Sequence, residues 1–371
     1  MKVIIVGASI AGSAAAYLLA KSGLNVSVYE QKKKKDVGKK VCANVVTPMI
    51  KELLKELDLD YKKLIKTAYN KALFFSKNNS VSFPTEEYEI NRGKFVEKMI
   101  RNSAKIGVKF NFETNFKELK EEGNKISIKF GKKNKVIYDS CDILIGADGA
   151  LSEVAKKAGL WQGRNFLLYL QTKISKKYIR NKKYIPKKNS YAVFLGDKFG
   201  YYSYIFSSSR GLIIGLGNRA EKNVKNEFYK FINFLGIDKK KVKLEGAMVP
   251  DPRIIKNKKR IILIGDAACQ IKFTGGGIIP SLLSAISVRE IIIKNDYSKL
   301  KKLRKNIFLN RTFGKFFLKF SDKDWESFLD IVKNNKFKEL PRNRDTMRIK
   351  SIVKVMDIRL FWFILRKFIF F

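Results

Sequence analysis

Histidine is absent from this sequence of 371 residues, and cysteine occurs only three times. Without histidine the chain has no Ser-His-Asp or Cys-His catalytic centre, no histidine-ligated metal and no histidine general base. The three cysteines, Cys42, Cys141 and Cys269, form no CxxC spacing. Such an odd and sparse set argues against a disulfide framework and a thiolate zinc site, and it is typical of a reducing compartment.

Acidic residues are scarce as well, with 34 Asp and Glu against 77 Lys and Arg, a formal net charge of +43. A low-GC coding bias would enrich Lys, Asn, Ile and Phe together without any selection for a basic surface. Alternatively, the basic surface binds an anionic partner, either a membrane surface or nucleic acid. Because no nucleic-acid-binding motif accompanies the charge, we expect no nucleic-acid partner.

Long uncharged apolar runs are also few. Residues 3–20 carry no charge but are interrupted by glycine and serine, and the C-terminal run 360–365 is followed directly by Arg366 and Lys367. We therefore expect no signal peptide and no transmembrane segment. With 45% apolar residues, the chain can bury a large core, either as two fused lobes or as one α/β unit.

The first 30 residues have the pattern of a strand–helix–strand unit. Residues 2–6 are a continuous apolar strand, a glycine-containing turn and a helix to about Lys21 follow, and Asn25–Glu30 is a second strand. Helical spacing recurs at 48–66 and at 91–106, the second helix beginning after Asn91 as N-cap.

Strand patterns continue downstream. We predict strands at 108–114, 126–130 and 135–138 and a buried strand from Cys141 that ends in a turn at Gly149. Short aromatic and β-branched runs predict an antiparallel sheet from 166–174, 190–195, 201–206 and 211–216. A buried strand at 260–266 and a helix near 276–293 follow, and from residue 294 onward the chain is expected to be helical, basic and aromatic.

The first turn carries a dinucleotide-binding motif. Gly7 permits the tight turn and Gly12 the close packing of helix on strand, while Ser9 replaces the middle glycine. Glu30 follows Gly12 by 18 residues, where an acid binds the hydroxyls of an adenosine ribose. An acid at this position also disfavours the additional phosphate of NADP.

Two later segments indicate which dinucleotide is bound. Residues 141–159 and 260–277 resemble the second and third fingerprints of flavoprotein monooxygenase-type FAD enzymes. The resemblance implies that Asp266 binds the ribityl or ribose of FAD and that the glycines after it face the isoalloxazine, since glycine permits a close backbone approach. It also implies that Arg92 is directed at the pyrophosphate.

A narrower resemblance is to the geranylgeranyl reductase family, which includes the archaeal digeranylgeranylglycerophospholipid reductases. It extends to about residue 295 and is carried by the segments 38–43, 200–206, 211–217 and 246–250. The sequence departs from the family where Tyr204 and Ser207 replace a Trp and a Pro. The resemblance places FAD contacts at Ala11, Glu30, Cys42, Ala43, Arg92, Asp266, Gly277 and Ile278. With Gly7, Ser9 and Gly12 of the first turn and Gly276 of the third fingerprint, these are the expected cofactor-binding residues. Substrate contacts are expected at Tyr202, Tyr204 and Phe206.

The expected fold is therefore α/β with α+β character. We predict a Rossmann-like FAD-binding domain from residues 1–70, 91–160 and 255–295, and an antiparallel-sheet substrate domain from 71–90 and 161–254. Residues 296–371 are expected to form a basic, aromatic helical region.

The resemblance implies reduction of isoprenoid double bonds, with hydride from reduced FAD and a proton from Cys42, a tyrosine or water. Cys42 could equally be a small buried filler. Two other functions stay open: an FAD-dependent hydroxylase of another apolar substrate, and a non-catalytic basic binding protein. The electron donor is expected to be ferredoxin or a reduced nicotinamide.

The tail, residues 353–371, combines basic and aromatic side chains. On a helix, Arg359, Arg366 and Lys367 fall within an arc of about 100° and leave a broad aromatic face. This pattern predicts an interfacial helix on anionic lipid and hence a cytoplasmic protein peripherally associated with the membrane. A helix docked on the protein core would have the same pattern.

Overall fold

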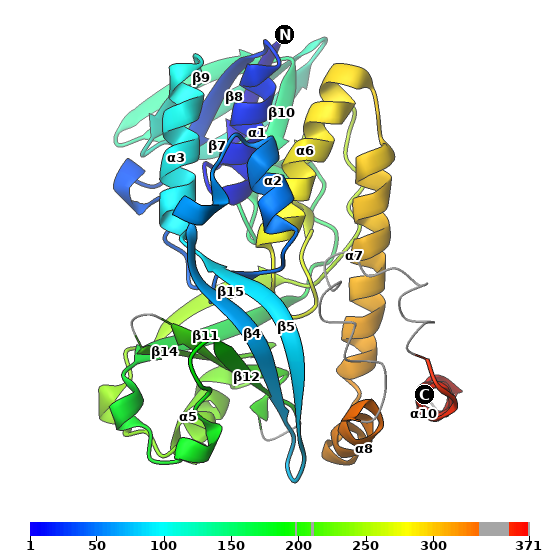
Figure 1. Ribbon diagram of the computed structural model, residues 1–371. Coiled ribbons are helices and arrows are strands. Elements are labelled where there is room, and N and C mark those ends of the chain that lie inside the picture. Colours follow the sequence, from blue (N-terminus) through cyan, green and yellow to red (C-terminus); the bar gives the residue numbers. More distant parts are fainter. Residues whose placement is uncertain (197–198, 209–210, 334–355, 370–371) are drawn as a thin grey trace.

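A parallel sheet forms the centre of the upper lobe in Figure 1. The computed structural model describes residues 1–196, 199–208, 211–333 and 356–369. The strand order is β16-β10-β1-β2-β6, and every pairing is parallel. The strands are β1 (Lys2–Val6), β2 (Asn25–Glu30), β6 (Lys109–Phe112), β10 (Ile143–Gly146) and β16 (Ile261–Leu263).

Both faces of this sheet are covered, which explains its nearly continuous apolar strands. Val3 and Ile5 face a cluster that includes helices α1 (Ile10–Lys21), α3 (Arg92–Lys105) and α6 (Ile278–Lys294). Ile4 and Val6, which alternate with them, face a second cluster with the antiparallel strands on the other side. These strands are β7 (Asn115–Glu122), β8 (Lys125–Lys132) and β9 (Lys135–Cys141).

The lower lobe is built on an eight-stranded sheet of order β15-β11-β14-β13-β12-β4-β5-β3. Helix α5 (Val224–Phe234) packs on one face, and aromatic side chains of the C-terminal helices pack on the other. The strands are β3 (Val45–Val46), β4 (Ile65–Phe75), β5 (Ser80–Ile90), β11 (Phe166–Ile174), β12 (Ser190–Phe194), β13 (Tyr202–Ser208), β14 (Gly211–Arg219) and β15 (Glu245–Pro250).

The remaining elements are helical. Helix α7 follows α6 back toward the lower lobe, where α8 and α10 lie (Figure 1). The α-helices are α2 (Ile50–Glu56), α4 (Glu153–Lys157), α7 (Ser298–Phe317), α8 (Asp322–Lys333) and α10 (Ile358–Ile369). Short 3-10 turns are η1 (Lys34–Asp36), η2 (Tyr61–Lys63), η3 (Lys176–Tyr178), η4 (Lys182–Tyr184), η6 (Lys239–Lys241) and η7 (Gly265–Ala268). The predicted fold class is confirmed.

One sequence prediction of local structure was wrong, and one strand was missed. The helix expected over 48–66 ends at Glu56, because Asp58 takes a left-handed conformation (φ 53°) and its carboxylate accepts a 2.6 Å hydrogen bond from the Tyr17 hydroxyl. The chain then enters β4 at Ile65. Strand β7 was not predicted, since its charged sequence has little apolar alternation and, among the strands that the structure describes, it pairs with β8 alone.

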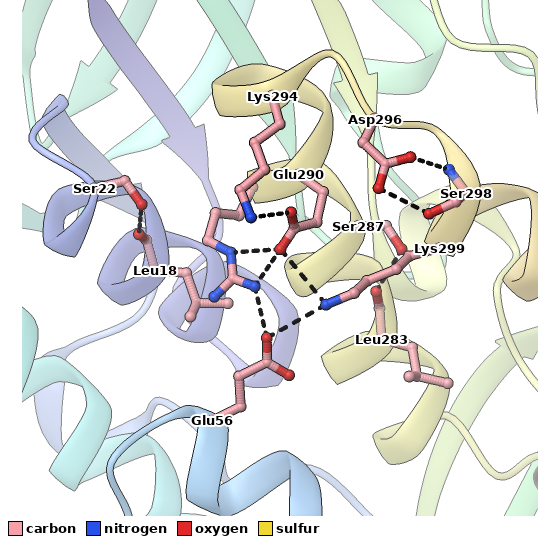
Figure 2. A network of polar contacts seen from close by, with 11 residues as sticks. Leu18, Ser22, Glu56, Leu283, Ser287, Glu290, Lys294, Asp296, Ser298 and Lys299 are labelled. Atoms are coloured by element: carbon pink, nitrogen blue, oxygen red, sulfur yellow. Dashed lines mark hydrogen bonds and ion pairs between the residues drawn. The ribbon is translucent and has the colours of Figure 1, made fainter.

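A charge network ties α6 to its neighbours, with Glu290 at its centre (Figure 2). Arg289 Nη2 lies 2.6 Å from Glu56 of α2, and it also bonds Glu290. Lys294 and Lys299 approach the Glu290 carboxylate to 3.1 and 3.5 Å. Burial opposes ionisation of Glu290, but these cations, Arg289 foremost, lower its pKa to about 2. The network therefore fixes α2 and the start of α7 against α6.

The tail helix α10 forms as expected and docks on α8. Leu360 is buried, the Phe363 ring lies 5.5 Å from that of Phe320, and Lys367 pairs with Asp324 at 2.6 Å. Phe363 and Lys367 therefore face the protein, whereas Trp362 is 54% exposed. Residues 353–355 and 370–371 of the predicted tail lie outside the described residues. Within the described part of the chain, no helix is both long and apolar enough to cross a bilayer.

Candidate functional site

The turn between β1 and α1 is tighter than any side chain would allow. Gly7 has a φ of 100°, and a Cβ atom there would lie 2.4 Å from the carbonyl oxygen of Ala147. A Cβ atom on Gly12 would lie 1.9 Å from the carbonyl oxygen of Gly7. The two glycines thus let α1 begin directly against the sheet, with the N–H groups of its first turn directed into the space above the strand ends.

Glu30 is held at the end of β2 by backbone groups. Its carboxylate accepts hydrogen bonds from Ala8 N–H at 2.8 Å and from Lys32 N–H at 2.9 Å. The side chain is buried in the protein but borders the cavity above the turn. The acid predicted from sequence spacing is therefore placed beside the glycine turn.

A cavity of about 650 Å³ lies at the carboxyl ends of the parallel strands and extends to β15 of the second sheet. It brings together residues from widely separated segments of the chain. Of the predicted FAD contacts, nine line this cavity: Gly7, Ser9, Ala11, Glu30, Cys42, Arg92, Asp266, Gly277 and Ile278. Gly12, Ala43 and Gly276 are outside the cavity lining but adjoin lining residues in the sequence.

Arg92 points a cation toward the start of α1. The helix α3 begins at Arg92 because the Asn91 side chain accepts a hydrogen bond from Lys94 N–H, as predicted. The guanidinium lies 3.4 Å from the Ser9 hydroxyl, and its buried Nε has no partner among the described residues. A buried unsatisfied donor on a cation next to a helix N-terminus is suited to an anionic ligand.

Asp266 lies in the turn after β16 and is paired with a residue that the sequence analysis missed. Lys40 Nζ lies 2.6 Å from Asp266 Oδ2, and both residues line the cavity. Burial opposes ionisation of Asp266, but Lys40 and, more weakly, Arg92 hold its pKa below the ordinary value. On its other side, a Cβ atom at Gly277 would lie 2.9 Å from Asp266 Oδ1. The carboxylate is therefore charged and needs the glycine beside it.

Cys42 is the accessible thiol among the three cysteines. It is partly exposed at the cavity, and its Sγ accepts a 3.2 Å hydrogen bond from Asn44 N–H. Cys141 and Cys269 are buried, and burial raises their pKa to about 12 and about 11, respectively. Both therefore stay protonated near neutral pH.

The predicted substrate residues Tyr202, Tyr204 and Phe206 lie on β13, in or against the aromatic cluster of the lower lobe. None of them is among the described residues that line the cavity. Tyr204 donates a 3.3 Å hydrogen bond to Gln171 Oε1, and Gly215 makes room for its ring. Burial, with a smaller effect of nearby Cys42, raises the pKa of Tyr204, so its hydroxyl keeps the proton.

Asp148 is a second cavity residue that the sequence analysis did not single out. It follows β10 and accepts hydrogen bonds from Ser152 Oγ at 2.6 Å and Val154 N–H at 3.0 Å. Burial raises its pKa. Its position at a strand end, like that of Glu30 and Asp266, was the signal that could have identified it. Lys40 gave no such signal, because it lies in a lysine-rich stretch of the sequence.

These residues fit a dinucleotide with a flavin ring. The α1 N-terminus and the unpartnered Arg92 donor suit a pyrophosphate, Glu30 and Asp266 suit hydroxyl groups, and the Gly277 loop gives a flat ring close access to the backbone. The fold and the site therefore define an FAD-binding flavoprotein. Residues 1–171 match the family model described as an FAD binding domain, and FAD is the cofactor of this site.

Comparison with known proteins shows which flavoproteins the chain is similar to. The chain is 27% identical over 321 residues to digeranylgeranylglycerophospholipid reductase 2 of Methanosphaera stadtmanae, covering 80% of each chain. It is 27% identical over 319 residues to the digeranylgeranylglycerophospholipid reductase of Methanocaldococcus jannaschii, covering 80% of this chain and 79% of that protein. The fold is shared with a geranylgeranyl bacteriochlorophyll reductase-like protein of Thermoplasma acidophilum, at a TM-score of 0.79 and 21% identity, over 97% of this chain and 98% of that one. The resemblance to the geranylgeranyl reductase family is thus confirmed.

Proposed function

We propose that the protein is an FAD-dependent reductase that saturates geranylgeranyl double bonds of membrane ether lipids. The observation that carries this proposal is the position of Cys42, whose segment lies between the FAD cavity and the aromatic face of the eight-stranded sheet. The similarity to digeranylgeranylglycerophospholipid reductases over 80% of the chain supports the same activity.

The cofactor would be held by the residues already described. The first turn of α1 and Arg92 would bind the pyrophosphate, and Glu30 the adenosine ribose. Asp266 would accept hydrogen bonds from the ribityl hydroxyls, and the backbone of the loop that ends at Gly277 would contact the ring system. These roles agree with the lining of the cavity and with the unpartnered Arg92 donor.

Reduced FAD, when bound, supplies a hydride for addition to one carbon of the double bond. The protein's part is to orient the chain, exclude water and hold a proton for the other carbon. Cys42 Sγ is the proposed proton donor, since it is the accessible thiol at the cavity. Tyr204, whose hydroxyl burial keeps protonated, is the alternative proton donor among the tyrosines of β13.

The substrate would lie along the aromatic face of β13. The ring centroids of Tyr204 and Phe206 are 5.2 Å apart. The Phe206 centroid lies 4.8 Å from that of Tyr191 and 5.6 Å from that of Tyr69. The cluster continues through aromatic residues of α7 and α8. These rings are buried under aromatic side chains of α7 and α8, so an isoprenoid chain would take the place of those side chains. Most of its contacts would then be hydrocarbon on aromatic ring.

Contact with the membrane is a further part of the proposal. Ile358, Phe361 and Trp362 of α10 are 72, 49 and 54% exposed, and Arg366 is exposed on the same helix. Exposed aromatic residues next to cations suit the interface of an anionic bilayer, where the lipid substrate resides. The electron donor would be ferredoxin or a reduced nicotinamide.

The test has two stages. The purified protein should show the absorption bands of bound FAD, and its reduced form should convert geranylgeranylated ether lipid to saturated lipid when both are mixed anaerobically, as measured by mass spectrometry. Supplying reduced ferredoxin or NADH in parallel would identify the donor. Oxygen consumption with hydroxylation of an apolar compound, and no saturation of the lipid, would overturn the proposal.

A further inference from the structure

The contact between Lys40 and Asp266 joins two parts of the cavity wall that are 226 residues apart in the sequence. We propose that this ion pair is a clamp that fixes the Cys42 segment against the flavin-binding turn, with Lys40 as its positioning residue. The consequence for catalysis rests on the proposed function of Cys42, whereas the clamp itself can be tested without turnover.

The segment 38–42 has no regular secondary structure to hold it. Its other described hydrogen bonds are local: Lys39 N–H to Asp36 O, Lys39 Nζ to Asp36 Oδ1, Lys40 N–H to Gly38 O, and Asn44 N–H to Cys42 Sγ. Gly38 also packs against α3, where a Cβ atom would lie 3.1 Å from Val96. The Lys40 side chain is thus the described polar group of this segment that reaches across the cavity.

Asp266 is positioned as the acidic partner of Lys40. It is charged, its Oδ2 bonds Lys40, and its Oδ1 lies over the position where Gly277 lacks a side chain. A single carboxylate therefore joins the Cys42 segment, the turn after β16 and the glycine loop. All three parts contribute residues to the cavity lining. In this proposal the ion pair holds the segment that carries the thiol next to the flavin-binding turn.

The Lys40–Asp266 ion pair is strong enough to hold the Cys42 segment in place. The two side chains are 32% and 17% exposed, which leaves them partly screened from water, and a charge-assisted hydrogen bond of 2.6 Å has favourable geometry. Lys39, the preceding residue, offers a matched comparison. It pairs with Asp36 at 3.0 Å, but its side chain is 65% exposed and its partner lies in the same surface turn.

The test measures how readily iodoacetamide alkylates Cys42 in the FAD-free protein. Because Cys141 and Cys269 are buried, the reaction reports on Cys42, and a Cys42→Ser variant verifies this. Lys40→Met is compared with Lys39→Met, which removes the same charge one residue away. Rates are measured at a pH high enough for the rate to be independent of pH, and this plateau rate reports the exposure of the thiol.

We expect Lys40→Met to raise the plateau rate roughly tenfold, the factor for losing one charge-assisted hydrogen bond, and Lys39→Met to leave it unchanged. Lys40→Arg should restore the wild-type rate, and Asp266→Asn should reproduce the effect of Lys40→Met. Lys40→Met should also weaken FAD binding.

Equal plateau rates in the Lys40→Met, Lys39→Met and wild-type proteins would overturn the clamp. A failure of every variant and of the wild type to bind FAD would instead refute the proposed function, while the alkylation rates would still report on the clamp.

Discussion

Glu30 gives a quantitative test of the cofactor site. In the Glu30→Ala variant, FAD would lose the charge-assisted hydrogen bonds to its ribose, which contribute roughly 1.5–3 kcal/mol. The dissociation constant should therefore rise roughly 10- to 150-fold. The variant has a second effect, since Ala8 N–H is fully buried and loses its acceptor. An unsatisfied buried donor costs about 1–3 kcal/mol, so the FAD-free protein should also be less stable.

The two effects can be separated. FAD titration followed by flavin fluorescence measures affinity, and urea unfolding of the FAD-free protein measures stability. Glu30→Gln keeps one acceptor oxygen for Ala8 N–H and should recover most of the stability but not the affinity. Glu113→Ala, an exposed acid at the neighbouring strand end, controls for the change in net charge. An unchanged FAD affinity in Glu30→Ala, with only the stability lowered, would show that Glu30 serves the backbone turn and not the cofactor.

Three further predictions concern other parts of the molecule. Cys42→Ser should bind FAD with wild-type affinity and reduce lipid roughly 100-fold more slowly; a wild-type rate would show that the thiol only fills space. Glu290→Gln should lower the free energy of unfolding by about 1–2 kcal/mol near neutral pH. Because the native pKa of Glu290 is lowered from 4.5 to about 2, the wild-type advantage should be complete above pH 4.5 and disappear as the pH falls through about 2, and urea unfolding at several pH values checks this. Replacing Phe361 and Trp362 together by Ser should weaken binding to anionic vesicles while FAD stays bound, whereas Phe308→Ser, an exposed aromatic on α7, should not; equal binding by all three proteins would assign the basic charge to composition.

Much of the FAD lobe could be predicted from the sequence, because its determinants are local. Gly7 and Gly12 are required by backbone contacts within one turn, and Asn91 caps the helix that it precedes. Glu30 and Asp266 could be identified because an acid at the end of a parallel strand always reaches the same edge of the sheet. Glu30 was predicted from its spacing of 18 residues after Gly12, and Asp266 from the resemblance of residues 260–277 to a flavoprotein fingerprint.

Features that depend on residues distant in the sequence were decided only by the tertiary structure. The end of α2 is set by Tyr17 bonding Asp58, and the Lys40–Asp266 pair joins residues that no sequence pattern relates. The tail shows the same limit: its amphipathic pattern suited either a bilayer or a protein surface, and only packing of Leu360 on α8 showed which side faces the protein. Hydrophobic periodicity specifies that a face is buried, but the partner that buries it is chosen by the packing of the whole chain.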